Sequence, residues 1–360
     1  MRIVSVASWT KELGLARPYT IAFRTVDSVS NVILEIRTDT GSVGLGAASP
    51  EPRVTGETLE ICGASLVQEE LGWLLGRDVE EIALLCQEAK QRIPDAPAAR
   101  AAVDIALHDL FAQQLKLPLA DALGRAHMDL PTSITIGIQG VEETLVEAHR
   151  CLGLGFSILK VKTGLDLEKD LERLDRLRES IGRDVRIRVD ANQGYTREET
   201  TRFFEKTVSL DLEFVEQPMK AGSVDAMREL PEAWKERIAA DESLLDDRDA
   251  LALAAPPRAC GIFNIKLMKC GGVRPALRIA AIAQAAGIDL MWGCMDESRI
   301  SIAAALHAAF ASAATRYLDL DGSLDLARDV VEGGFVLERG RMRTTGAPGL
   351  GLGVLTAGRR

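Results

Sequence analysis

Five ionisable residues recur at even spacing along the chain, each at the end of a short apolar run: Lys162, Asp190, Glu216, Asp241 and Lys266. Thr135 precedes this set, Asp296 and Asp319 follow it, and successive gaps run from 23 to 30 residues. Such a gap fits one strand and one returning helix, so each polar group should emerge at the same end of its strand. Packing alone does not explain ionisable side chains that close successive apolar strands.

Three of these residues, Asp190, Glu216 and Asp241, are carboxylates on consecutive predicted strands. Without compensation they would repel one another and raise one another's pKa. A hard divalent cation removes this cost, and oxygen ligands with open positions for water and substrate suit Mg²⁺. The competing interpretation pairs each carboxylate with a nearby base, and Arg186 and Arg188 share a strand face with Asp190. Because Glu216 and Asp241 lack such a neighbour, we predict one Mg²⁺ per subunit.

Two lysines lie where they could move protons on either side of that metal. Lys160 and Lys162 are two residues apart, so both should point into the same space and depress each other's pKa. A lysine shifted down from about 10.4 can act as a general base near neutral pH. Lys266 closes the sixth strand, across the ring from Lys162. We therefore predict that Lys162 and Lys266 are the catalytic pair, whereas a single strand-end lysine would more simply form a salt bridge.

Asp319 and Asp321 flank one residue at the end of the eighth predicted strand. The same spacing argument places both carboxylates on one side, where they could bind a cation such as a substrate ammonium. Taken alone, this pattern also fits a helix-entry cap.

The elements that must position these residues are eight short strands alternating with charged helices. This alternation favours a (β/α)-type barrel with its site at the C-terminal mouth, although an open parallel sheet would give a similar pattern. The expected strands are Thr132–Ile136, Ile158–Lys162, Val185–Asp190, Leu212–Glu216, Ile238–Asp241, Ile262–Lys266, Leu290–Gly293 and Arg316–Asp319. The expected helices between them include Asp166–Ile181 and Arg274–Ala286.

The first part of the chain has a different sequence pattern. Asn31–Arg37 is rich in β-branched residues and is followed by a turn signal, and Ala98–Leu115 is an alanine-rich helical segment. We expect an α+β domain over residues 1–128, a barrel over 129–322, and a C-terminal segment, 323–360, that returns to the first domain.

The composition excludes several classes of partner. The net charge is −10, which disfavours binding to nucleic acid or to an anionic membrane. No apolar run is long enough for a transmembrane helix, and the six scattered cysteines fit reduced thiols in a cytoplasmic protein. We expect a homo-oligomer that binds a small-molecule substrate.

The motifs around these residues resemble those of the enolase superfamily, in its muconate-lactonising subgroup. The motifs span most of the chain and are Lys160–Lys162, Val189–Gln193, Val215–Pro218, Ala240–Ser243, Asn264–Gly272, Arg24–Val26 and Pro348–Gly351. With Asp319 and Asp321 added, the chain is similar to the dipeptide epimerases, typified by L-Ala-D/L-Glu epimerase. The resemblance implies a modified (β/α)7β barrel of the TIM type, covered by an α+β capping domain formed from both termini.

The resemblance also implies the roles of the site residues. Lys162 and Lys266 would be the acid/bases, with Lys160 and Thr135 near the substrate carboxylate. Asp190, Glu216 and Asp241 would bind Mg²⁺, and Asp319 and Asp321 would take the α-ammonium of a dipeptide. The reaction is then a two-lysine 1,1-proton transfer through an enolate that inverts the α-carbon of the C-terminal residue.

The side-chain pocket departs from the Ala-Glu pattern. Arg24 matches the arginine that would meet an acidic side chain, but Asp296 stands where Ala-Glu enzymes have an aliphatic residue, and Glu51 lies in a capping loop. Two added carboxylates favour a cationic side chain. We therefore predict a preference for dipeptides containing Arg or Lys, unless Asp296 or Glu51 pairs with Arg24 or Arg53.

Other activities also fit parts of this pattern. Within the superfamily these are Ala-Glu epimerase, muconate cycloisomerase and o-succinylbenzoate synthase, and the last two do not require the Asp319–Asp321 pair. A Schiff-base aldolase would use one barrel lysine as a nucleophile. A non-catalytic protein that kept the fold would have no need of the clustered charges.

Overall fold

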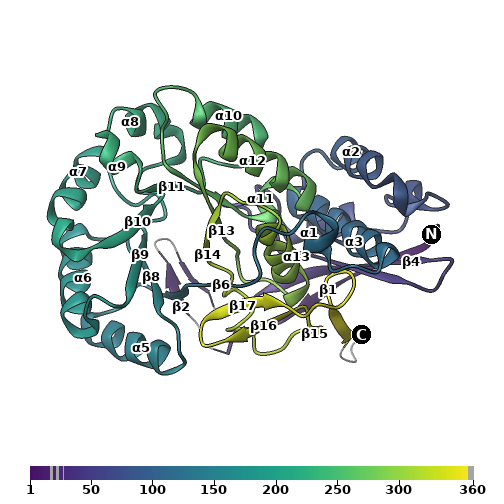
Figure 1. The fold of residues 1–360 in the computed structure, drawn as a ribbon, viewed down its shortest axis with the longest axis horizontal. Helices are drawn as coiled ribbons and strands as arrows, with labels where there is room; N and C mark the ends of the chain where they lie inside the picture. Colours follow the sequence, from purple (N-terminus) through teal and green to yellow (C-terminus); the bar gives the residue numbers. More distant parts are fainter. Residues whose placement is uncertain (17–18, 22–23, 27, 356–360) are drawn as a thin grey trace.

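The computed structural model describes residues 1–16, 19–21, 24–26 and 28–355, with the backbone alone for 19–21, 24–26, 354 and 355 (Figure 1). Its larger part is an eight-stranded parallel sheet in which the strands lie in chain order. These strands are β7 (Ile134–Ile136), β8 (Ile158–Lys162), β9 (Arg186–Asp190), β10 (Leu212–Glu216), β11 (Ile238–Ala240), β12 (Ile262–Ile265), β13 (Asp289–Trp292) and β14 (Thr315–Leu318). A parallel bridge between Thr132 and Leu318 joins the two ends of the sheet. The sheet is therefore curled into a barrel, as the sequence predicts.

Every connection between these strands contains a helix, which gives the (β/α)7β order. The helices are α5 (Val141–Gly153), α6 (Leu167–Ile181), α7 (Arg197–Lys206), α8 (Val224–Arg228), α9 (Glu232–Lys235), α10 (Asp247–Ala254), α11 (Leu267–Cys270), α12 (Val273–Ala286) and α13 (Arg299–Phe310). Their starts follow local capping chemistry. The carboxylate of Asp166 accepts hydrogen bonds from the N–H groups of Glu168 and Lys169. Asp166 is thus the cap that precedes the helix, and α6 begins at Leu167, one residue later than predicted.

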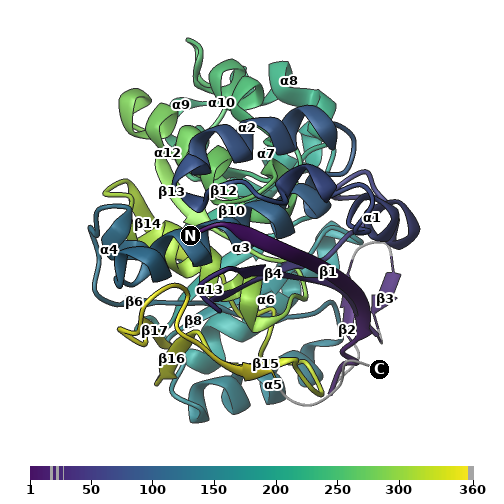
Figure 2. The ribbon, with the colours of Figure 1, turned by 90° about the vertical axis from the view of Figure 1, so that its right-hand side faces the viewer.

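The N-terminal part packs an antiparallel sheet against helices. It contains β1 (Ile3–Glu12), β2 (Tyr19–Ile21), β3 (Arg24–Val26), β4 (Ser30–Thr38), β5 (Val43–Ala48), α1 (Leu59–Ser65), α2 (Ile82–Arg92), α3 (Pro97–Leu115) and α4 (Leu119–Ala122). Figure 2 views the molecule from the side of this domain, with β1 running across the front. Helix α3 lies so close to β5 that a Cβ at Gly46 would stand 1.9 Å from the carbonyl oxygen of Ala102. Glycine is therefore required at this contact.

The C-terminal segment forms short strands beside both parts: β15 (Val331–Gly333), β16 (Phe335–Glu338), β17 (Arg341–Thr344) and β18 (Leu352–Leu355). β17 pairs with β6 (Leu130–Pro131) at the entry to the barrel. The N–H of Leu350 donates to the carboxylate of Asp109 in α3 at 2.9 Å. These contacts are of the kind expected from a division into residues 1–128, 129–322 and 323–360, and that division stays a prediction.

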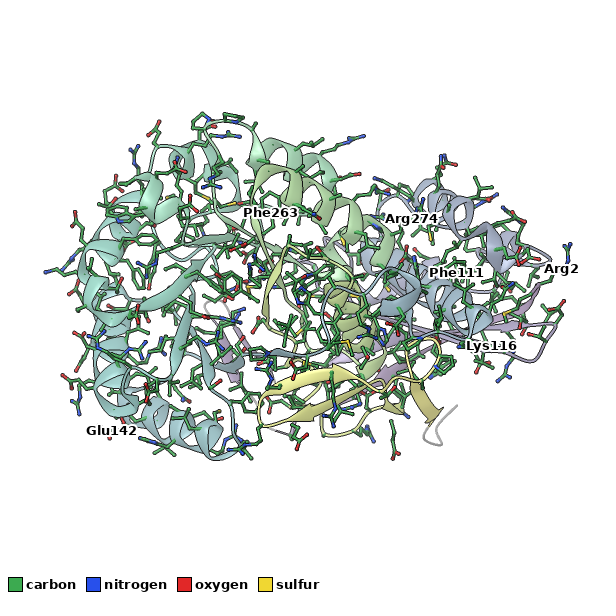
Figure 3. All side chains as sticks on the ribbon, viewed as in Figure 1. Arg2, Phe111, Lys116, Glu142, Phe263 and Arg274 are labelled. Carbon is green, nitrogen blue, oxygen red and sulfur yellow. The ribbon has the colours of Figure 1, made fainter. Side chains whose placement is uncertain are left out.

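The core runs through both parts, and charged side chains cover the outside. Figure 3 shows Arg2, Lys116 and Glu142 at the outer surface, whereas Phe263 of β12 is fully buried. Within the described residues, no helix has both the length and the apolar character needed to cross a bilayer.

Candidate active site

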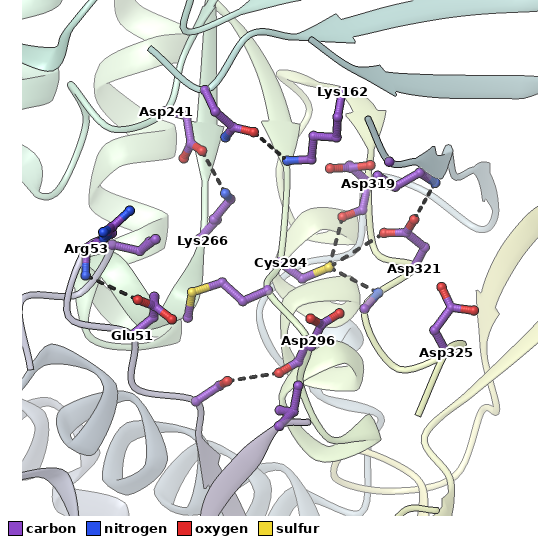
Figure 4. A pocket seen from close by; sticks show the side chains of 18 of the residues that line it. Glu51, Arg53, Lys162, Asp241, Lys266, Cys294, Asp296, Asp319, Asp321 and Asp325 are labelled. Atoms are coloured by element: carbon purple, nitrogen blue, oxygen red, sulfur yellow. Dashed lines mark hydrogen bonds and ion pairs between the residues drawn. The ribbon is translucent and has the colours of Figure 1, made fainter. Parts of the chain in front are cut away.

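A cavity of about 980 Å³ opens at the C-terminal ends of the barrel strands (Figure 4). Its wall includes side chains from β8 and from the segments that follow β12, β13 and β14. The N-terminal part covers it with residues 49–54, which include Glu51 and Arg53. The strands therefore place most of the predicted polar residues in one space, at the mouth where barrel enzymes have their sites, whereas Asp190 and Glu216 are fully buried and do not line it.

The two predicted catalytic lysines reach this cavity from opposite strands. The Nζ of Lys162, at the end of β8, lies 2.7 Å from Oδ2 of Asp190 and 3.1 Å from Oδ1 of Asn192. The Nζ of Lys266, directly after β12, lies 2.7 Å from Oδ2 of Asp241. Three strands separate β8 from β12, so the ammonium groups approach the cavity from two sides.

The three predicted metal ligands lie on the strands between these lysines, and all are buried. Burial and the neighbouring Asp190 raise the pKa of Glu216 to about 8. Burial acts to raise the pKa of Asp190 as well, but Lys162 and Lys160 lower it to about 2. An oxygen of Glu216 lies 2.8 Å from the Nζ of Lys160 without hydrogen-bond geometry. A buried set of hard oxygen donors fits a divalent cation such as Mg²⁺.

The arginines of β9 do not neutralise this set. The Nε of Arg188 lies 2.7 Å from Glu213, and one of its terminal nitrogens donates to the carbonyl oxygen of Leu318 at 2.6 Å. Arg186 also pairs with Glu213. Each carboxylate instead has a lysine partner, so the competing interpretation holds in that respect. The pairs are Asp190 with Lys160 and Lys162, Glu216 with Lys160, and Asp241 with Lys266 and Lys269.

Lys160 is buried among three carboxylates. Its Nζ lies 2.7 Å from Asp319, 2.8 Å from Glu216 and 3.2 Å from Asp190. Burial acts to lower the pKa of Lys160, but these carboxylates raise it well above its ordinary value. Burial likewise acts against the charged form of Lys266, but Asp241 and Glu216 raise its pKa. The predicted depression of the pKa is thus wrong for Lys160, because the facing carboxylates outweigh the neighbouring Lys162.

Asp319 and Asp321 lie side by side in the wall of the cavity (Figure 4). The hydroxyl of Ser133 donates to Oδ1 of Asp319 at 2.7 Å, and the backbone N–H of Thr135 donates to Oδ2 of Asp321 at 2.7 Å. Burial and the neighbouring Asp319 raise the pKa of Asp321 to about 7. A bound cation would relieve this cost, which fits the predicted ammonium pocket.

The residues predicted to meet the substrate side chain lie along the capping side of the cavity. Asp296 and Glu51 both line it. The hydroxyl of Ser49 donates to the carbonyl oxygen of Asp296 at 2.9 Å, and the N–H of Arg53 reaches Oε1 of Glu51 at 3.4 Å. The side chain of Arg24 lies outside the described residues, and its role stays a prediction.

Two family models cover most of the chain. The mandelate racemase/muconate lactonizing enzyme N-terminal domain matches residues 3–124, and the enolase C-terminal domain-like model matches residues 143–357. The chain belongs to the enolase superfamily. The predicted fold class and family are therefore confirmed.

Relatives within the superfamily include proteins named for a defined activity. The L-Lys-D/L-Arg epimerase of Methylococcus capsulatus is 62% identical over 352 residues, which covers 98% of this chain and 99% of the relative. A crystal structure of the dipeptide epimerase from that organism, complexed with Mg and the dipeptide L-Arg-D-Lys, superposes with a TM-score of 0.97 and covers 98% of this chain and 99% of that one. The substrate-liganded L-Ala-D/L-Glu epimerase of Bacillus subtilis is 32% identical with a TM-score of 0.95, covering 99% and 100% of the two chains.

This enolase-superfamily site also contains residues that sequence reasoning missed. Asn192 contacts Lys162, Cys294 contacts the turn that carries Asp319, and Asp325 lines the cavity. Glu242 is half-buried next to Asp241, and burial together with Asp241 raises its pKa to about 7. Asn192 and Glu242 lie inside motifs that the resemblance used, so the motif itself was a signal for both. Cys294 and Asp325 carried no comparable signal.

A second cluster of possible metal ligands lies outside the cavity. Among the described residues, Cys86, Asp104 and His108 have potential ligand atoms within 4.8 Å of one another, which the three strand-end carboxylates do not. However, Oδ1 of Asp104 already accepts the backbone N–H of Val273 at 2.6 Å and of Arg274 at 3.3 Å. It also lies 3.0 Å from Nδ1 of His108. We assign this cluster a structural role, because Asp104 caps the start of α12.

Proposed function

We propose that this protein is a Mg²⁺-dependent dipeptide epimerase that inverts the α-carbon of the C-terminal residue. The observation that carries the proposal is the placement of Lys162 and Lys266. They enter one cavity from β8 and β12, with three buried carboxylates on the intervening strands. Two bases on opposite sides of one carbon are what removal of a proton from one face and return to the other require.

In this mechanism Asp190, Glu216 and Asp241 would bind the metal. When bound, the cation supplies positive charge that stabilises negative charge developing on the substrate carboxylate. One lysine in its neutral form removes the α-proton, and the other, as an ammonium, delivers a proton to the opposite face. The ion pairs of Lys162 with Asp190 and of Lys266 with Asp241, each at 2.7 Å, orient the two side chains toward the space between them.

The opposite end of the substrate would be bound by Asp319 and Asp321. Asp319 is buried and Asp321 is half-buried, and Lys160 pairs with Asp319 but not with Asp321 among the ion pairs of the described residues. A dipeptide ammonium would add a positive charge to this pair. Lys160 and Thr135 lie between this pocket and the metal ligands, so we keep the proposal that they lie near the substrate.

We further propose that the preferred side chains are cationic. Asp296 and Glu51 add carboxylates to the cavity wall on the capping side. The relative that is 62% identical is named L-Lys-D/L-Arg epimerase, which agrees with this assignment. Arg24 would have to lie clear of the cationic side chain, and that placement is a proposal too.

A cytoplasmic location and a homo-oligomeric state also belong to this proposal. All six cysteines are free thiols, which fits a reducing compartment. Size-exclusion chromatography with light scattering would test the oligomeric state.

The experiment that tests the function compares kcat/KM for L-Lys-L-Arg, L-Arg-L-Lys and L-Ala-L-Glu. Removal of divalent cations by EDTA followed by addition of Mg²⁺ or of buffer is the control. We expect the cationic dipeptides to be preferred, and activity to disappear with EDTA and return with Mg²⁺. A preference for L-Ala-L-Glu would contradict the cationic assignment. Activity that survives EDTA and is trapped by borohydride would instead support Schiff-base chemistry.

A further inference from the structure

Cys294 connects the two loops that form the ammonium end of the cavity. It directly follows Gly293 at the end of β13, and it lines the cavity beside Asp319 and Asp321 (Figure 4). Its Sγ lies 3.2 Å from the carbonyl oxygen of Asp319 and 3.3 Å from the backbone nitrogen of Gly322. The same sulfur is 4.0 Å from Oδ1 of Asp321. One thiol thus contacts both sides of the turn that carries the carboxylate pair.

The chemistry of the thiol suits these contacts. Burial and the neighbouring carboxylates of Asp321 and Glu297 raise the pKa of Cys294 well above its ordinary value, so the group keeps its proton. The protonated thiol can donate to the Asp319 carbonyl while its sulfur accepts from the Gly322 N–H. Both partners are backbone groups, so the contact fixes the path of the turn from residue 319 to residue 322.

The turn approaches the loop after β13 more closely than any side chain would permit. A Cβ at Gly322 would lie 1.9 Å from the carbonyl oxygen of Met295 and 2.9 Å from the Sγ of Cys294. The N–H of Glu297 also donates to the carbonyl oxygen of Gly322 at 3.3 Å. The two loops therefore form one hydrogen-bonded unit, and Cys294 lies at its cavity side.

This unit opposes the repulsion between the two carboxylates that it carries. Asp319 and Asp321 carry like charges, the first buried and the second half-buried. Such a pair favours conformations that separate the charges or expose them to water. Ser133 and Lys160 fix Asp319, and the Thr135 N–H fixes one oxygen of Asp321. The contacts of Cys294 with Asp319 and Gly322 restrain the backbone on both sides of Asp321.

We infer that Cys294 is a positioning residue that sets the spacing of the Asp319–Asp321 pair for a substrate ammonium. It acts through the backbone of the turn and does not exchange protons with the substrate. This inference rests on the proposed function, because it assigns a purpose to the ammonium pocket of that reaction. Its consequence is selective: loss of the thiol should weaken binding of the ammonium and leave the chemistry at the α-carbon intact.

The test uses Cys294→Val, Cys294→Ala and Cys294→Ser in the full chain. Valine and alanine both remove the group that donates to the Asp319 carbonyl and accepts from the Gly322 N–H, and alanine adds no bulk. Serine keeps a donor and an acceptor in its hydroxyl group. Cys260→Ala is the matched control, because Cys260 is a fully buried thiol outside the cavity lining. Thermal unfolding of each variant checks that it is folded. The readouts are KM and kcat for a cationic dipeptide, and inhibition constants for that dipeptide's analogue without the α-amino group.

We expect KM to rise about tenfold in the valine and alanine variants, with kcat changed less than about twofold. We expect serine to restore KM to within about threefold of the unchanged enzyme. The amino-free analogue should bind all variants equally well, and Cys260→Ala should match the unchanged enzyme. An unchanged KM in folded Cys294→Ala, or equal loss of affinity for the amino-free analogue, would overturn the inference. An unchanged enzyme inactive on every dipeptide would instead count against the proposed function.

Discussion

Single replacement of each catalytic lysine should separate the two halves of the reaction. In Lys266→Met the side chain keeps its approximate length and loses its ammonium, so the base on one face of the α-carbon is removed. Lys162→Met removes the base on the other face. Each variant should still abstract the α-proton from the diastereomer whose C–H faces the remaining lysine. Neither variant should be able to invert the centre.

The structure sets the expected effects of these replacements on stability and on rate. Lys266 contributes one buried ion pair with Asp241, but Asp241 keeps Lys269 as a second partner. Removing one partner of a buried pair commonly costs about 3–5 kcal/mol, and the remaining lysine should reduce that to about 2 kcal/mol, so the variant should fold. Loss of a general acid/base should slow epimerisation by about 10³-fold or more. Exchange from the accepted diastereomer should stay within about tenfold of the unchanged enzyme.

The assay is proton NMR in D₂O at saturating Mg²⁺, following the α-proton of the C-terminal residue in each diastereomer separately. Saturating metal is needed because both lysines contact predicted metal ligands. The two variants should show opposite patterns: one exchanges the L,L form and the other exchanges the L,D form. If both variants lose exchange from both diastereomers to the same extent, or if either one epimerises at the original rate, the two-base reasoning is refuted.

Three further predictions concern specificity, pH and packing. Asp296→Asn should lower kcat/KM for Lys- and Arg-containing dipeptides by about tenfold and change it little for alanine-containing ones, and a uniform loss would contradict the assigned role. Burial lowers the pKa of His307 to about 4, below the unfolded value of about 6.5. The unfolded chain therefore binds this proton more readily, and the stability of the fold decreases as the pH falls from about 6.5 toward about 4. Between pH 7 and pH 5, the free energy of unfolding measured with urea should fall by about 2 kcal/mol less in His307→Asn than in the unchanged protein. An equal fall in both proteins would refute this. Gly46→Ala should destabilise the protein by about 2–4 kcal/mol because its Cβ would meet the backbone of Ala102, whereas Gly63→Ala, in open helical space, should be neutral or slightly stabilising.

Much of the barrel could be predicted because its pattern is local. β8 and β10 have the bounds expected from their apolar runs, and α6 begins directly after the aspartate that caps it. Polar residues at strand ends could then be assigned to one mouth without knowing any distance, since parallel strands share their direction. The prediction of a dipeptide epimerase with a cationic preference relied on the same positions, and it agrees with the names of the relatives.

What could not be predicted depends on contacts between distant segments. The sign of the pKa shift of Lys160 depends on Asp319, 159 residues away, and not on its sequence neighbour Lys162. The role of Cys294 could not be predicted, because nothing in the sequence distinguishes a cysteine that only packs from one that contacts a turn 28 residues later.

The central claim is that two lysines exchange one proton at the α-carbon of the C-terminal residue of a cationic dipeptide. The most direct measurement incubates the unchanged enzyme with L-Arg-L-Lys and Mg²⁺ in D₂O and determines both the site of deuterium and the configuration. We predict one deuterium at the α-carbon of the C-terminal lysine, none at the α-carbon of the arginine, and conversion to L-Arg-D-Lys. Deuterium at the N-terminal α-carbon, or no exchange at either carbon, would contradict this account.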